Sequence, residues 1–293
     1  MTPTLAVYLF GHNLEKIRYP YIASIESALD LVGKSGAVFY AECDSDPDDT
    51  AWEHICDLRR DHPNLLLLKS KWGEHFSVQA HIANFLLDNI GTQYDFALKL
   101  DADEVLCEWS FDEFRKQLEF MRDNGWVLGR PRYTHFTPDF EHEFPFCYQS
   151  KAVLTKTDSF LRFNTNPKTG NADGCAIGGA REFQTELMIQ HFGKVQTGRE
   201  QEALMKEISF QAMYSLPEDG LGFPDARVIA LVEQGYIDYR KVFEVTDAEG
   251  KIVPFTGKHP KYMKKWIEES ILRSKTFWDK IKLSQIASGV TPS

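Results

Sequence analysis

The stretch YDFALKLDADEVL, residues 94–106, joins a short apolar run to a cluster of acidic residues. Its first half, 96–100, is nearly continuous in apolar residues, which is typical of a strand covered on both faces in a parallel sheet. Asp101, Asp103 and Glu104 follow at the predicted carboxyl end of that strand, where open α/β sheets bind ligands. Because crowded carboxylates repel one another, we expect a compensating cation, and Mg²⁺ is usually held by carboxylates together with substrate phosphates. A solvated turn that caps the next helix is the simpler alternative.

Three other apolar runs precede this stretch and alternate with helical patterns. The predicted strands are 5–10, 37–41 and 65–68, and the predicted helices that follow them are about 20–33, 50–60 and 77–89. Alternation of strand and helix predicts a parallel sheet wound by right-handed crossovers. The sequence therefore indicates an α/β protein with a mostly parallel, Rossmann-like central sheet flanked by helices.

The second half of the chain is less regular. We expect strands at 126–128, 152–155 and 187–190, a long Gly- and Asn-rich loop at 164–179, and a helix around 200–213. From Phe255 onward eight Lys or Arg stand against three Asp or Glu, and apolar residues recur on an approximate helical stripe. These patterns predict a main domain at 1–254 and a basic amphipathic helical extension at 255–293 that packs on it.

The composition suits a folded protein, since 43% hydrophobic and 13% aromatic residues in a chain of 293 allow a packed core. The formal net charge of −10 argues against a general nucleic-acid binder, which would show a basic face. The five cysteines are widely spaced, which favours reduced thiols in a cytoplasmic compartment and argues against a zinc site. The first residues lack a basic signal-peptide start and a run long enough for a bilayer, so we expect a cytoplasmic protein with no integral membrane segment.

Three local patterns resemble those of GT-A fold glycosyltransferases, specifically the family 2-like enzymes that use sugar nucleotides. LDADE at 100–104 is similar to the Asp-x-Asp motif that holds a divalent metal against a nucleotide diphosphate. QHFG at 190–193 resembles the His-aromatic-Gly segment that closes the metal site from the C-terminal side. NADG at 171–174 resembles an acidic segment between the two. The resemblance spans most of 5–214 and implies a GT-A-like fold.

Two features of that family are missing here. Family 2 members commonly carry an Arg-Asn pair on the helix before the metal motif, whereas Ala83 stands at the Arg position and Asn84 at the Asn position. The Gln-x-x-Arg-Trp signature of processive polysaccharide synthases is also missing from the sequence. The resemblance therefore favours an enzyme that transfers a single sugar over a polymerase.

The resemblance implies an inverting hexosyl- or pentosyltransferase that uses a UDP- or GDP-sugar donor, a hydroxyl acceptor, and Mn²⁺ or Mg²⁺. It implies Asp101, Asp103 and His191 as metal ligands, with Asp101 also bridging to the ribose. The residues expected to contact the nucleotide are Phe10, Gly11, His12, Glu42, Asp44, Asn84, Asp101 and Ala102. Inversion requires a general base toward the acceptor, for which Asp173 and then Glu182 are the candidates. The simpler alternatives are a structural His191, ordinary turn residues at the strand ends, and solvated loop acids.

The acceptor and two other functions stay open at this stage. A glycan, a lipid-linked glycan or a modified nucleic acid would each supply a hydroxyl, and the basic extension could contact an anionic acceptor or a membrane surface. A simpler reading is a helix that packs its aromatic residues on the domain. A nucleotidyltransferase should show a Gly-rich, cation-bearing phosphate loop after the first strand, but residues 10–13 contain one Gly and no cation. The other alternative is a metal- or glycan-binding module without catalysis.

Overall fold

The computed structural model describes residues 2–72, 78–136, 140–143, 151–159, 161–163, 181–193, 195 and 253–272. The first elements are β1 Leu5–Gly11, α1 Tyr21–Val32, β2 Ala37–Cys43, α2 Ala51–Asp61, β3 Leu65–Ser70, α3 Val78–Ile90 and β4 Phe96–Lys99. The next are β5 Glu104–Leu106, the 3₁₀ turn η1 Glu108–Ser110, α4 Phe111–Asp123, β6 Leu128–His135, β7 His142–Glu143, β8 Leu154–Lys156 and η2 Thr157–Ser159. The last are β9 Glu182–His191, β10 Val253–Pro254, η4 Lys261–Met263 and a helix at 264–272.

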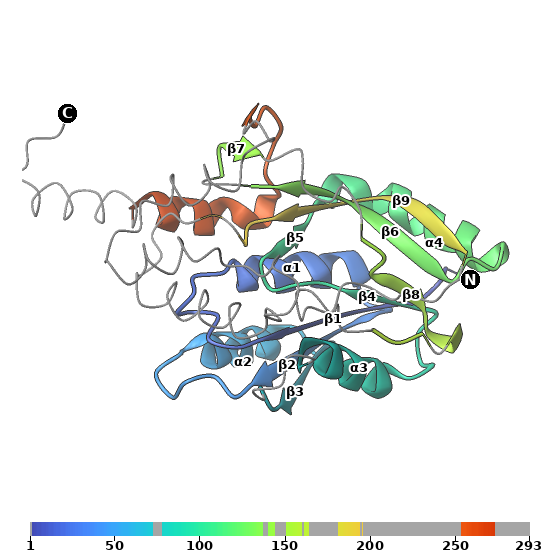
Figure 1. Cartoon of the computed structure of the whole chain (residues 1–293), viewed down its shortest axis with the longest axis horizontal. Coiled ribbons are helices and arrows are strands. Elements are labelled where there is room, and N and C mark those ends of the chain that lie inside the picture. Colours follow the sequence, from blue (N-terminus) through green and yellow to red (C-terminus); the bar gives the residue numbers. More distant parts are fainter. Residues whose placement is uncertain are drawn as a thin grey trace, which may run out of the picture.

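Eight strands form one mixed sheet in the order β3-β2-β1-β4-β8-β6-β9-β5 (Figure 1). Strand β1 pairs in parallel with β2 and β4, β2 pairs in parallel with β3, and β6 pairs in parallel with β9. Strand β8 is antiparallel to both β4 and β6, and β5 is antiparallel to β9. The predicted α/β class, with a mostly parallel sheet flanked by helices, is confirmed.

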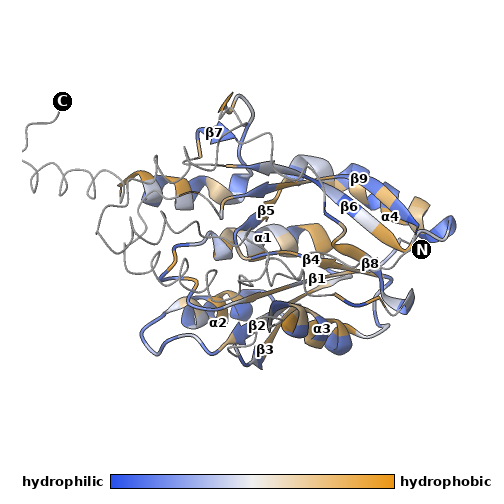
Figure 2. Ribbon diagram, viewed as in Figure 1, coloured by the Kyte–Doolittle hydropathy of each residue, from blue (hydrophilic) through white to orange (hydrophobic). Residues whose placement is uncertain are grey.

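Strand β1 shows why the central strands are apolar along their whole length. Val7 and Leu9 belong to a hydrophobic cluster that also contains residues of α1 and α4, whereas Ala6 and Tyr8 belong to a cluster with α3. All four side chains are 0% exposed. Figure 2 shows the apolar strands in the interior and polar residues on the outward sides of the helices. Helices on both faces therefore leave no solvent-facing position in β1, as expected for buried parallel strands.

Strands β6 and β9 are longer than the sequence patterns predicted. They pair along almost their whole length, with a bulge between Arg130 and Arg132. Arg130 forms an ion pair with Glu182 at 2.7 Å, and Arg132 forms one with Glu186 at 2.6 Å, both near the surface. Because polar residues alternate with buried ones here, neither strand gives a continuous apolar run. The strands predicted at 126–128 and 187–190 were therefore too short.

Residues 253–272 pack against α1 and the end of β9. Strand β10 pairs antiparallel with β7, Lys261 forms an ion pair with Asp30 of α1 at 2.7 Å, and Trp266 donates from Nε1 to the Arg18 carbonyl at 3.2 Å. The Trp266 and Phe192 ring centroids are 5.7 Å apart. The rest of the predicted extension, the predicted helix at 200–213 and the predicted loop at 164–179 lie outside the described residues. The domain boundary at 254 stays a prediction.

Three cysteines fall within the described residues, and all three are free thiols. Burial raises the pKa of the Cys43 and Cys107 thiols well above the ordinary value. Within the described residues, no helix is both long enough and apolar enough to cross a bilayer.

Leu98→Ala tests the central position of β4 in this core. Leu98 is 0% exposed. Removal of its side chain is therefore expected to lower the free energy of unfolding by about 2–5 kcal/mol through lost burial and a residual cavity. Leu272→Ala is the matched control, because that side chain is 67% exposed, and its effect should stay within about 0.5 kcal/mol. Urea titration measures both values, and equal losses in the two variants would contradict this assignment of the core.

Candidate functional site

The carboxyl ends of β1 and β4 lie side by side where the sheet changes its direction of winding. From β1 the chain proceeds to β2 and β3 on one side, and it then returns to β4 on the other side of β1. Open α/β sheets bind their ligands at such a switch point, outside the carboxyl ends of the strands. Gly11 ends β1 and Lys99 ends β4. The residues that follow these two positions therefore border the edge where a ligand is expected.

The Asp101 carboxylate lies between two lysine ammonium groups. Lys99, whose side chain is 2% exposed, bonds to Oδ1, and Lys151 donates to Oδ2 at 3.0 Å. Burial alone would raise the pKa of the Asp101 carboxyl, but Lys151 and Lys99 together lower it well below its ordinary value. Both carboxylate oxygens of Asp101 are thus engaged by cations of the protein. The metal and ribose contacts expected of Asp101 stay predictions.

Glu104 completes the same network from a fully buried position. Its Oε1 accepts a hydrogen bond from Lys151 at 3.2 Å, and its Oε2 accepts one from the Asp101 backbone N–H at 2.9 Å. Burial raises the pKa of the Glu104 carboxyl, although Lys151 opposes this shift. Glu104 therefore holds the turn at 101–104 together. Asp103 is the acidic residue of LDADE that faces a different partner.

That partner is His191, at the end of β9. The antiparallel pairing of β5 with β9 sets Glu104 opposite His191, and the Phe192 N–H donates to the Asp103 carbonyl at 2.8 Å. The Asp103 Oδ2 and His191 Nε2 atoms are consequently 3.4 Å apart. Burial disfavours the charged form of His191, but Asp103 outweighs this effect and the pKa of the imidazole is raised. Two residues predicted from separate motifs thus meet.

His135 also belongs to this group, and the sequence patterns did not single it out. It ends β6, and the parallel register of β6 and β9 pairs it directly with His191. The two Nδ1 atoms are 2.9 Å apart, so one imidazole donates a hydrogen bond to the other. His135 is 4% exposed, and Tyr133 stacks on its ring at 5.7 Å. A His in a polar, alternating stretch gives no sequence signal of such a contact.

Gly193 leaves space beside the Asp103 and His191 side chains. A Cβ atom at this position would lie 2.2 Å from Asp103 Oδ2 and 2.9 Å from His191 Nε2, closer than real Cβ contacts allow. The final Gly of QHFG is therefore explained by close approach. The two donor atoms border the volume that a side chain at position 193 would fill.

The donors beside Gly193 fit a hard divalent cation that is shared with a substrate. Two donors each about 2.1 Å from one ion lie roughly 3.0–3.5 Å apart, which the Asp103–His191 separation matches. Carboxylate oxygen and imidazole nitrogen are suitable ligands for Mn²⁺, and such ions usually retain water and substrate phosphate ligands. Within the part of the chain that the structure describes, no group of three or more His, Cys, Asp or Glu is arranged to hold a metal ion. Asp103 and His191 are the residues that would hold the cation.

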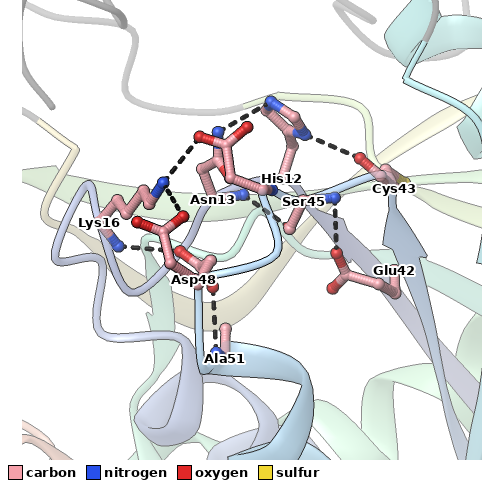
Figure 3. A network of polar contacts seen from close by, with 10 residues as sticks. His12, Asn13, Lys16, Glu42, Cys43, Ser45, Asp48 and Ala51 are labelled. Atoms are coloured by element: carbon pink, nitrogen blue, oxygen red, sulfur yellow. Dashed lines mark hydrogen bonds and ion pairs between the residues drawn. The ribbon is translucent and has the colours of Figure 1, made fainter.

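The loops that follow β1 and β2 are cross-linked at the same edge of the sheet (Figure 3). The Asn13 N–H donates to Ser45 Oγ at 2.8 Å, and Asn13 Oδ1 accepts from the Asp46 N–H at 2.7 Å. The Lys16 ammonium bonds to Asp46 at 2.7 Å and also to Asp48. These bonds join two loops about thirty residues apart in sequence into one unit.

His12 and Trp72 form a stacked aromatic pair beside these loops. His12 Nδ1 donates to the Cys43 carbonyl at 2.8 Å, because a carbonyl only accepts, and Nε2 faces the Asn13 amide at 3.1 Å (Figure 3). The His12 and Trp72 rings stack with centroids 5.2 Å apart and an interplanar angle of 4°. The Trp72 backbone N–H donates to Asp44 Oδ2 at 3.2 Å. Trp72 was not among the predicted nucleotide contacts, although its place directly after the third strand was a usable signal.

Asn13 and Asp44 adopt a left-handed backbone conformation, with φ of 54° and 49°. Positive φ is uncommon outside glycine, although Asn and Asp tolerate it best, and it persists where surrounding contacts hold it. Phe10 and Gly11 end β1 next to these loops, and the Phe10 ring lies 6.2 Å from the Trp72 ring. The predicted residues Phe10, Gly11, His12 and Asp44 are thus gathered at one edge.

The other predicted nucleotide contacts bond within the protein. Glu42 is buried and accepts hydrogen bonds from a tyrosine hydroxyl at 3.0 Å and from a backbone N–H at 3.1 Å. Asn84 exchanges two hydrogen bonds with the Phe163 backbone, at 2.8 and 3.0 Å. The Ala102 carbonyl accepts a hydrogen bond from Ser24 at 3.0 Å. The nucleotide roles of Glu42, Asn84 and Ala102 stay predictions.

The structure does not bring Glu182 to the Asp103–His191 pair. Glu182 is the first residue of β9 and His191 is the last, so a strand of this length separates them by about 30 Å. The Glu182 carboxylate is instead paired with Arg130. Asp173, the first candidate for the general base, lies outside the described residues.

No protein-family model matches this chain, and no curated protein sequence matches it. Among solved structures, S. aureus TarS is similar with a TM-score of 0.44 and 10% identity over 80% of this chain and 42% of that one. The chain thus spans less than half the length of TarS. The 1–349 fragment of TarS is similar with a TM-score of 0.46 and 11% identity, over 92% of this chain and 80% of the fragment. Mannosyltransferase PcManGT from Pyrobaculum calidifontis, in complex with GDP-Man and Mn²⁺, is similar with a TM-score of 0.46. The sequence identity is 14%, and the match covers 96% of this chain and 88% of PcManGT. At these identities the likeness concerns architecture alone.

Asp101→Asn and Asp103→Asn should separate the structural carboxylate from the one that faces His191. Loss of the Asp101 charge leaves the buried Lys99 ammonium without its carboxylate partner, so we expect the free energy of unfolding to fall by about 3 kcal/mol. Asp103→Asn should cost about 1 kcal/mol, because a neutral His191 still has a polar neighbour. Urea unfolding of the two variants decides the point. A larger loss from Asp103→Asn would show that the two roles are assigned the wrong way round.

Gly193→Ala tests the close approach at the end of β9. The added methyl group must displace the Asp103 or His191 side chain, so we expect a loss of about 1–3 kcal/mol in the free energy of unfolding. An Asp103→Ala background removes the nearer of the two close contacts, so the two losses should not add. Additive losses in this double-mutant cycle would contradict the contact.

Proposed function

We propose that this chain is a metal-dependent glycosyltransferase that moves a sugar from a nucleoside-diphosphate donor to a hydroxyl acceptor. The observation that carries the proposal is the Asp103–His191 pair beside Gly193, assembled from the LDADE and QHFG motifs. The stacked His12 and Trp72 rings, which follow β1 and β3, supply a second ligand surface at the carboxyl edge of the same sheet. Both features lie at strand ends around the switch point, which is the expected ligand site of this architecture.

Asp103 and His191 would hold a divalent cation against the donor diphosphate. When bound, the cation supplies positive charge that stabilises the departing diphosphate without proton transfer. Asp103 contributes a carboxylate oxygen, and His191 contributes the lone pair of Nε2. Gly193 keeps the approach to both atoms open. Asp101 stabilises the turn through Lys99 and Lys151, and its predicted contacts with metal and ribose are part of this proposal.

The nucleotide would occupy the edge formed by the loops after β1, β2 and β3. The stacked His12 and Trp72 rings offer a flat surface for a base, because base–aromatic stacking is favourable with any base. Asp44 is exposed beside Trp72 and can accept hydrogen bonds from a base or a ribose. These features suit a UDP- or GDP-sugar, a donor class that Mn²⁺ or Mg²⁺ would accompany.

An inverting transfer needs a carboxylate that takes the proton of the acceptor hydroxyl. Asp173 is our candidate for this general base, and the distance of Glu182 from His191 speaks against Glu182 in that role. The acceptor is proposed to be a glycan, a lipid-linked glycan or a modified nucleic acid. Basic residues at 258–265 are the surface that an anionic acceptor would meet. A cytoplasmic location is part of the same proposal.

The two competing functions predict different behaviour. A nucleotidyltransferase would need a cationic phosphate loop after β1, but Lys16, the first cation there, is bonded to Asp46 and Asp48. A non-catalytic module would bind a cation or a sugar without consuming a donor. Donor turnover therefore separates the leading proposal from the module.

The test is a thermal-shift panel of UDP, GDP, UDP-sugars and GDP-sugars, each with Mn²⁺ or with EDTA. A ligand at about 100 times its dissociation constant adds about 2.7 kcal/mol to stability, which corresponds to a shift of several degrees. We expect one nucleotide family to stabilise the wild type in Mn²⁺, and Asp103→Asn to lose this stabilisation. A donor that shifts the protein is then assayed for release of free UDP or GDP.

Asp112→Asn is the matched control, because its side chain on α4 is 93% exposed and its carboxylate pairs with Arg115 at 3.2 Å. It should respond to nucleotides as the wild type does. Stabilisation without any release of nucleotide diphosphate would favour the binding module. The absence of any nucleotide effect in well-folded wild type would overturn the proposal.

A further inference from the structure

His135 and His191 share one hydrogen bond. Its direction decides whether His191 carries a proton or a lone pair on Nε2, the nitrogen that faces Asp103. Their Nδ1 atoms are 2.9 Å apart, and the rings meet edge to face at 71°. A bond between two imidazole nitrogens needs one proton, so one ring donates and the other accepts. The opposite nitrogen of His191, Nε2, faces Asp103 Oδ2.

With both rings neutral, two proton arrangements satisfy this geometry. If His135 donates, His191 accepts at Nδ1 and carries its proton on Nε2, directed at the Asp103 carboxylate. If His191 donates from Nδ1, a lone pair remains on Nε2 and points toward Asp103 and the space beside Gly193. Only the second arrangement offers a nitrogen ligand to a cation, because a protonated nitrogen has no lone pair to give.

We infer that His135 is a positioning residue for the cation site, because it accepts the Nδ1–H of His191 and so keeps the Nε2 lone pair directed at Asp103. The inference rests on the proposed function, since it requires that Asp103 and His191 bind a divalent cation. Histidine ligands generally donate their other ring N–H to a neighbouring acceptor, which fixes the tautomer and the ring orientation. His135 supplies that acceptor from the adjacent strand.

The setting of His135 suits this role. It stands directly opposite His191 in the β6–β9 register, so the backbone fixes the distance between the two side chains. Its ring is 4% exposed and is stacked on Tyr133 at an interplanar angle of 13°, which limits rotation. When His135 accepts at Nδ1, its own proton must lie on Nε2. The pair is therefore a defined donor and acceptor held by the sheet.

The test compares Mn²⁺ binding in the wild type, His135→Asn and His135→Leu, followed by the electron paramagnetic resonance signal of free Mn²⁺ with UDP or GDP present. Asn places an oxygen acceptor on Cγ, where His carries Nδ1, whereas Leu has no acceptor. We expect His135→Leu to weaken Mn²⁺ binding about 10–100-fold and His135→Asn to bind close to wild type. His62→Leu, at the C-cap of α2, is the matched control and should not change binding.

The outcomes distinguish this inference from the proposed function. Equal Mn²⁺ affinity in the wild type and His135→Leu would overturn the role of His135 while leaving the metal site intact. An equal loss in His135→Asn and His135→Leu would also overturn it, because a retained acceptor should rescue binding. Failure of the wild type to bind Mn²⁺, with either nucleotide, would overturn the metal site of the proposed function and this inference with it.

A measurement on the wild type alone covers the case in which His135→Leu does not fold. Nitrogen-15 NMR of the histidine side chains, with Zn²⁺ as a diamagnetic substitute, reports which ring nitrogen carries the proton. We expect His191 to be protonated at Nδ1 and His135 at Nε2. A proton on Nδ1 of His135 would overturn the inference.

Discussion

The parallel pairing of β1 with β2 on one side and β4 on the other is the constraint on which the rest of this structure depends. It places helices on both faces of the central strands, so the core excludes water on both sides of β1. Together with the parallel β2–β3 pairing, it also directs the carboxyl ends of four strands to one edge. The polar residues that follow each strand lie at this edge, beyond the last hydrogen bonds between strands. The location of the site therefore follows from strand order before any individual side chain is considered.

The pairing of β5 with β9 adds what the parallel half of the sheet lacks. It joins segments almost ninety residues apart and sets the turn after β4 against the end of β9. Asp101 and Asp103 then take different partners two residues apart, the first between lysines and the second against His191. The two aspartates of the motif therefore have different neighbours: Asp101 lies between two lysines, and Asp103 lies against a histidine. The pair that fits a cation is produced by long-range pairing, with LDADE and QHFG each supplying half.

Much of the fold was predictable from sequence, because strands buried on both faces give continuous apolar runs, as in 96–100. Strands β6 and β9 gave no such signal, since Arg130 and Arg132 face outward and interrupt the apolar pattern. Of the candidate site, Asp103 and His191 were predicted from motif resemblance, and the structure brings their side chains together. His135, Lys151 and Trp72 were missed, because their contacts come from strand register, from a segment about fifty residues away in sequence and from ring stacking. No local spacing encodes such contacts. Glu182 was proposed from its nearness in sequence to His191, but an extended strand turns nine residues into a long separation.

The cross-linked loops after β1 and β2 have a consequence for how a ligand would be received. Asn13 and Asp44 are held in a left-handed conformation by hydrogen bonds that form when the chain folds. The conformational entropy of these loops is therefore lost during folding, and a molecule arriving at the His12–Trp72 surface has little left to order. Recognition at this edge would then resemble docking onto a finished surface, with affinity governed by shape and stacking.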